Sequence, residues 1–224
     1  MAVDRKTAAP RALRHPARVR TRDLTGGGTT GNERLTAATG AMLLVPLAVI
    51  GVTIIWLRAL LSVHLFVGLL VIGPVALKLA STGYRFVRYY TASPAYRREG
   101  PPAAPLRAIA PIVVVSTIVV LASGVALLFA GPASRDTLLP IHKVSFIVWG
   151  VFTGLHVLAY LPRMGHALQA DYGRSRSLSG DVTGRAGRLL SLAGALTAGA
   201  VLAVLLIPEF GPWLHSSGLL HHHD

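Results

Sequence analysis

Cysteine is absent from this sequence, and acidic side chains are scarce. The 224 residues include no cysteine and only 9 Asp or Glu. The lack of cysteine excludes disulfides, thiolate metal sites, covalently attached c-type haem and iron–sulfur clusters. No Asp or Glu lies within the long apolar runs of the chain. Their absence there argues against a carboxylate proton relay, a cation transporter with acidic ligands, and a membrane metalloprotease.

Long apolar runs are the most abundant feature of the chain. Hydrophobic residues make up 52% of the sequence and charged residues only 14%. A membrane-spanning helix needs about 20 mostly apolar residues. We therefore predict an all-α integral membrane bundle, in contact with a lipid bilayer, of five transmembrane helices. Their expected ranges are 35–57, 62–84, 108–130, 141–161 and 189–207.

Basic residues are unevenly distributed and give the chain a net charge of +13. Eight Lys or Arg lie in residues 1–34, five in 85–107 and five in 163–188, against three in the other connections and the C-terminus. Those three are Arg58, Arg135 and Lys143. The positive-inside rule then predicts a cytoplasmic N-terminus and an extracytoplasmic C-terminus. The basicity is thus a topological signal, and nucleic acid is not expected as a partner.

The sequence predicts one membrane domain, residues 35–207, between two tails. Residues 1–34 read as a disordered basic cytoplasmic tail, and 208–224 as a short extracytoplasmic tail. The second tail carries a short histidine cluster of the kind that binds transition metals. A flexible end gives such ligands no fixed geometry, so we assign it no site.

The candidate polar residues within the apolar runs are His64, Lys78, His142 and His156. Each costs about 2–4 kcal/mol in the membrane unless it is paired or liganded. His64 and Lys78 are fourteen residues apart, as are His142 and His156. That spacing puts each pair on one helix face, about 21 Å apart along the axis. Because the second and fourth spans run in the same direction, two tiers are expected, His64 with His142 and Lys78 with His156.

Two histidines at one depth on facing helices can supply both axial nitrogens to a haem iron. Gly68, Gly150 and Gly154 give their helices smooth surfaces on which a porphyrin could lie. The cations at the outer boundary can pair with haem propionates, and they fit equally well as ordinary interfacial residues.

VHLFVGLL at His64 and IHKVSFIVWGVFTGLH from His142 to His156 resemble the membrane-embedded b-type cytochromes. This broad group includes cytochrome b561 and the cytochrome b subunits of bacterial redox complexes. The resemblance covers roughly residues 60–165, and GYRFVRYYT also resembles segments of actinobacterial proteins of this type.

The resemblance implies that His64 and His142 bind one haem b and that His156 is one ligand of a second. It also implies an electron-transfer subunit of a bacterial plasma membrane. Such a subunit passes electrons between a quinone pool and a partner redox protein.

Lys78 departs from the family pattern, because it occupies the place of a fourth histidine. Three interpretations stay open. Lys78 is an iron ligand as a neutral amine, or it lines a quinone or proton-exchange site with His156, or its amine extends to the cytoplasmic headgroups. The count of haems is therefore one or two.

A different class of function is also open. The histidines can form interhelical hydrogen bonds in a haem-free scaffold or transporter. A membrane enzyme without haem is less favoured, because no nucleophile–base pair or metal triad is visible in the spans.

Overall fold

The computed structural model describes residues 28–91, 94–98, 104–172 and 184–218. Within these ranges every regular element is a helix, as the sequence predicts. Five helical stretches are long and apolar enough to cross a membrane. They are α1 (Gly28–Ile55), α2 with α3 (Leu57–Leu70 and Ile72–Tyr90), α5 (Ala104–Ala130), α6 (Arg135–Tyr172) and α7 (Arg185–Leu205).

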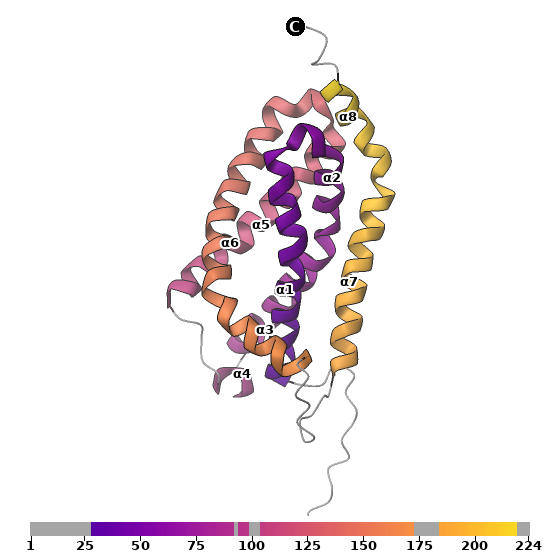
Figure 1. Ribbon diagram of the computed structural model, residues 1–224. Helices are drawn as coiled ribbons and strands as arrows, with labels where there is room; N and C mark the ends of the chain where they lie inside the picture. Colours follow the sequence, from indigo (N-terminus) through magenta and orange to yellow (C-terminus); the bar gives the residue numbers. More distant parts are fainter. Residues whose placement is uncertain (1–27, 92–93, 99–103, 173–183, 219–224) are drawn as a thin grey trace, which may run out of the picture.

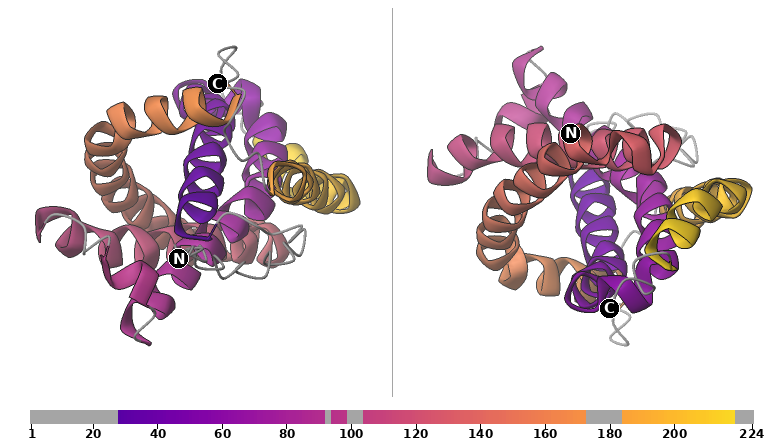
Figure 2. Two further views of the ribbon diagram at one scale, coloured as in Figure 1. Left: turned by 90° about the horizontal axis from the view of Figure 1, so that it is seen from below. Right: turned by 90° about the horizontal axis from the view of Figure 1, so that it is seen from above.

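Short elements connect or follow these helices. They are α4 (Pro94–Arg98), the 3-10 turns η1 (Pro132–Ser134) and η2 (Ile207–Phe210), and α8 (Gly211–Gly218). The α1–α2 turn and α8 lie at one end of the bundle, called here the upper end, and α4 lies at the other, the lower end (Figure 1). α6 and α7 lie on opposite sides of the bundle (Figure 2).

The helix bounds differ from the predicted spans in several places. α1 begins at Gly28, so the last residues of the expected N-terminal tail are helical. α6 is 38 residues long and extends well beyond the predicted 141–161. The expected C-terminal tail contains η2 and α8. Residues 1–27 and His221 to His223 lie outside the described part of the chain, so the predictions made for them stay predictions.

The second span is bent rather than continuous. α2 ends at Leu70 and α3 begins at Ile72, with Pro74 in its first turn. Proline has no backbone N–H, so the carbonyl of Leu70 loses its usual helical donor. The bend lies between the residues that the sequence assigns to the two tiers, seven residues from His64 and from Lys78.

The bend packs against α7 through backbone atoms. A Cβ placed on Gly199 would overlap the carbonyl oxygen of Leu70, and one on Gly73 would overlap that of Ala195. Only glycine permits this approach, and small residues at helix crossings are how membrane helices come close together. The crossing fixes the second span against α7.

An apolar core joins four elements in the upper half of the bundle. Its buried members come from α2, α5, α7 and η2: Leu69, Leu128, Ala203 and Phe210. Leu65 and Phe66 of α2 pack against this core. The indole N–H of Trp213, in α8, donates to the carbonyl of Leu127 at 3.2 Å. The chain that follows α7 is therefore part of the helical bundle and holds α2 in place next to His64.

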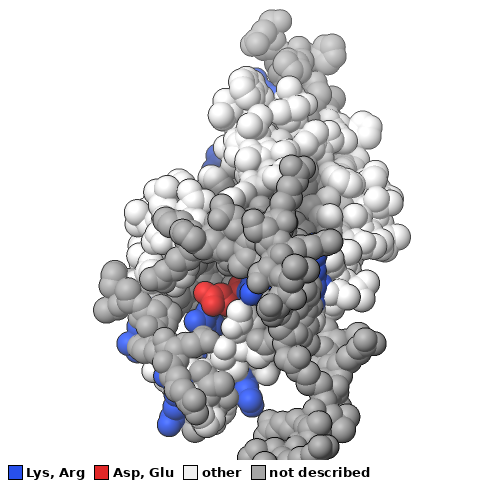
Figure 3. Space-filling model, turned by 60° about the horizontal axis from the view of Figure 1, so that its bottom comes forward, with Lys and Arg blue, Asp and Glu red and all other residues white. Residues whose placement is uncertain are grey.

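Charged side chains mark the two ends. Lys and Arg gather around the lower end (Figure 3), and the described ones there are Arg34, Arg85, Arg88, Arg97, Arg107, Arg185 and Arg188. This is the end at which the sequence places the cytoplasm.

The backbone crossing makes a testable prediction. Gly199→Ala should lower the stability of the bundle by about 1–3 kcal/mol, because the added methyl group forces α2 and α7 apart. Thermal unfolding in detergent, followed by circular dichroism, measures the change. Gly194→Ala on the same helix is the control, because a Cβ there meets nothing within 4 Å. Equal melting temperatures for the two variants would contradict this account of the crossing.

Candidate functional site

The structure brings His64 and His142 together across the bundle interior. Their ring centroids are 6.5 Å apart, and the ring planes are inclined at 88°. α2 packs mainly on α1 and α7, whereas α6 packs mainly on α5 and α1. The two rings therefore approach each other from helices that have different main neighbours. The expected upper tier is present.

The orientation of His64 is set by Thr53 on α1. The Thr53 hydroxyl is buried and donates its one proton to the carbonyl of Ile50 at 2.7 Å. Its oxygen lies 2.9 Å from Nδ1 of His64. Since the hydroxyl proton is already used, Nδ1 must donate and the threonine oxygen must accept. His64 therefore carries its proton on Nδ1.

The orientation of His142 is set by α5. Its Nδ1 lies 3.1 Å from the carbonyl oxygen of Val120 and 3.1 Å from the hydroxyl of Ser123. A carbonyl only accepts, so Nδ1 of His142 is also the protonated nitrogen. Gly124 leaves room for the imidazole in this position, because a Cβ there would lie only 3.1 Å from Cε1 of His142.

Both rings thus have the tautomer of a metal ligand. A metal-binding histidine commonly donates from one ring nitrogen to a protein acceptor and coordinates through the other. Among the described residues, every hydrogen bond of these two imidazoles involves Nδ1, which leaves the Nε2 lone pairs free. With a metal–nitrogen bond of about 2.0–2.1 Å on each side, the two centroids would lie about 6.4 Å apart. The observed 6.5 Å fits one shared metal ion.

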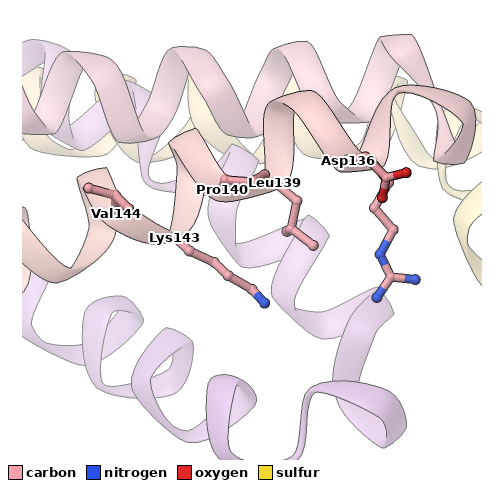
Figure 4. Close-up of a pocket in the computed structure, with 6 residues that line it drawn as sticks. Asp136, Leu139, Pro140, Lys143 and Val144 are labelled. Atoms are coloured by element: carbon pink, nitrogen blue, oxygen red, sulfur yellow. The ribbon is translucent and has the colours of Figure 1, made fainter.

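The surroundings of His64 and His142 contain open helix surface and basic side chains, as the sequence leads us to expect beside a haem. A Cβ on Gly68, Gly150 or Gly154 would meet nothing within 4 Å, so the surface is open one turn after His64 and along α6 between His142 and His156. At the upper end of α6, beside His142, a hollow of about 390 Å³ is lined by Arg135, Asp136, Leu139, Pro140, Lys143 and Val144 (Figure 4). Figure 4 shows the Lys143 side chain extending into this hollow.

The lower tier is organised around Lys78. Its ammonium donates to the carbonyl of Thr36 on α1 at 2.6 Å. Ser81, one turn along α3, accepts from the Thr36 hydroxyl at 3.1 Å and donates to the carbonyl of Lys78 at 3.0 Å. Asn32 on α1 donates to the carbonyl of Ser81 at 3.1 Å. Lys78 is therefore held inside a polar α1–α3 contact.

His156 lies on α6, which also packs against α1. Its Nδ1 is buried and has no hydrogen-bond partner, and the same holds for the hydroxyl of Thr153 one turn earlier. The ring lies against Tyr160 of the same helix, with centroids 4.7 Å apart. Among the described residues, no hydrogen bond or ring contact joins His156 to Lys78, so the second expected pair is not in contact as the first is.

Thr53, Ser123 and Gly124 are site residues that the sequence did not indicate. Thr53 reaches His64 because the chain reverses at Trp56, between α1 and α2. Ser123 and Gly124 lie in a mostly apolar helix that also carries Ser116 and Thr117, so their polarity alone does not single them out. The C-terminal His215 has no part in the site, since its Nδ1 lies 2.6 Å from the carbonyl of Gly211 within α8.

Comparison of the chain with protein-family models, with curated proteins and with solved structures gave no match in any of the three. Within the described residues, no group of three or more His, Cys, Asp or Glu side chains could hold a metal ion. The site is therefore a histidine pair, and its chemistry has to be argued from geometry.

The two tautomers can be checked directly. In protein labelled with 15N-histidine and produced in a haem-deficient host, His64 and His142 should both be protonated at Nδ1, because only that tautomer satisfies Thr53 and Val120. 15N NMR at mildly alkaline pH, where imidazoles are neutral, distinguishes the tautomers. His64→Ala and His142→Ala assign the resonances. An Nε2-protonated form of either ring would refute the assignment.

Proposed function

We propose that this chain is a b-type cytochrome of the membrane, in which His64 and His142 hold a haem iron between α2 and α6. The observation that carries the proposal is the pair of fixed tautomers. Nδ1 of each ring donates to the protein, Nε2 has no hydrogen bond among the described residues, and the ring centroids lie 6.5 Å apart. Two purely structural histidines would normally satisfy both ring nitrogens, whereas each of these uses Nδ1 alone among the described residues.

The residues of the site have distinct tasks in this proposal. Thr53, Val120 and Ser123 orient the two imidazoles and increase their basicity by accepting hydrogen bonds from Nδ1. Gly124 leaves room for the His142 ring. The apolar core that includes Leu69 and Phe210 shields the region from water, which influences the redox potential. Haem iron supplies one-electron chemistry when bound, while the chain supplies ligands, depth and dielectric.

The chain acts in this proposal as the membrane subunit of a bacterial redox complex, with its basic lower end in the cytoplasm. It exchanges electrons with a quinone pool and a partner redox protein. The described elements outside the spans are short, five residues in α4 and eight in α8. The small size of these elements supports a separate partner protein, because nicotinamide and flavin cofactors need a folded domain to bind them.

A dithionite-reduced minus oxidised absorbance spectrum of the detergent-purified protein tests the proposal. We expect the spectrum of low-spin, bis-histidine haem b. His64→Ala and His142→Ala should each abolish it, because one axial ligand is lost. His215→Ala is the matched control, since that ring bonds within α8, and it should keep the full spectrum.

The opposite outcome has a defined meaning. Protein that is folded yet carries no haem, even when expression is supplemented with haem precursors, would refute the cytochrome proposal. The haem-free scaffold or transporter would then remain, with His64 and His142 as interhelical residues.

The hydroxyl that orients His64 gives a second prediction. Thr53→Val keeps the shape of the side chain and removes the acceptor for Nδ1, so haem affinity should fall roughly 10- to 100-fold. Titration of haem into the haem-free protein measures the affinity. Thr39→Val is the control on the same helix, because Thr39 is also fully buried but bonds only the carbonyl of Leu35. Equal losses in the two variants would mean that Thr53 merely packs.

A further inference from the structure

The lower tier differs from the upper tier in the one feature that prepares a histidine for iron. We infer that the chain holds a single haem, and that Lys78 bonds to α1 instead of ligating, with His156, the second haem that the family pattern implies. This inference rests on the proposed function, since it concerns how many haems a cytochrome of this sequence binds.

His156 is not oriented as a ligand. The histidines of the upper tier each donate from Nδ1 to an acceptor on a neighbouring helix. Nδ1 of His156 is buried and unpaired, so no acceptor fixes its ring. Its ring contact is with Tyr160, on its own helix. A ligand without this outer partner lacks the group that normally sets its tautomer and raises its basicity.

Lys78 is already committed to another helix. Its nitrogen lies 2.6 Å from the carbonyl oxygen of Thr36, a short distance typical of a charged donor. An iron ligand would need a deprotonated amine whose lone pair points at the metal. The hydrogen bonds of Thr36 and Ser81 beside it tie the same stretch of α3 to α1. Moving Lys78 toward an iron would leave the carbonyl of Thr36 without this donor, which is costly in a membrane interior.

A single haem iron in the upper half implies a different electron path from that of a two-haem cytochrome. A protein with two stacked haems carries electrons across the bilayer by itself. With a single haem beside the α1–α2 turn and α8, the donor and the acceptor must both reach the cofactor from the upper half of the bundle. The lower half then contributes packing and topology.

Haem per chain, measured by the pyridine haemochrome method with saturating haem supply, tests the inference. We expect one haem per chain and a single one-electron wave in a redox titration. His156→Leu and Lys78→Gln should both keep one haem, and the glutamine amide can still donate to Thr36. His142→Ala is the matched control on α6 and should have none.

The outcomes separate this inference from the proposed function. Two haems per chain in the parent protein, falling to one in His156→Leu or Lys78→Gln, would overturn the single-haem inference and leave the upper site intact. No haem in the parent protein would refute the proposed function, and the single-haem inference with it.

Discussion

A bilayer interior supplies no hydrogen-bond partners, and this constraint governs the polar residues of the bundle. Each must find its partner within the protein or pay several kcal/mol. Most buried hydroxyls of the described residues comply by bonding to carbonyls of their own helix, as Ser116 does to Ile112 at 2.6 Å, while that of Thr153 has no partner. Thr53 and Ser123 do this too, and each also contacts a histidine of the neighbouring helix. The same rule that makes the helices self-sufficient thereby fixes the imidazoles.

The arrangement of His64 and His142 also depends on how closely the backbones of neighbouring helices can approach one another. α2 is held by a glycine-mediated contact with α7, and α6 is packed closely along α5. Pro74 leaves the carbonyl of Leu70 without a helical donor, and Gly199 has no side chain that would obstruct this carbonyl. The bend and the crossing therefore stabilise one another. These contacts set the positions of the two helix axes. The separation of His64 and His142 is therefore a property of backbone packing as much as of the histidines themselves.

Much of this fold follows from the sequence. Five spans can be read from length and apolarity, and the fourteen-residue spacing correctly places His64 opposite His142. Pro74 predicts a kink of the kind that membrane helices tolerate, and the structure adds the close contact of this region with α7. Thr53 and Ser123 were missed because hydroxyls in membrane helices usually bond their own backbone, a role that leaves no trace in spacing. The C-terminal turn and α8 were read as a tail, since a short polar segment gives no sign of a buried Phe210.

The two tiers show why spacing alone overstates the number of metal sites. Both helices repeat the fourteen-residue spacing, yet only His64 and His142 are brought into ring contact. What separates the two tiers is the partner of the ring nitrogen that faces away from the site: a threonine oxygen and a carbonyl in the upper tier, nothing for His156 in the lower. Coordination needs a lone pair that points at the metal, and the outer hydrogen bond is what holds it there. The residues around a histidine, rather than the histidine itself, therefore decide whether a tier of this kind is prepared for iron.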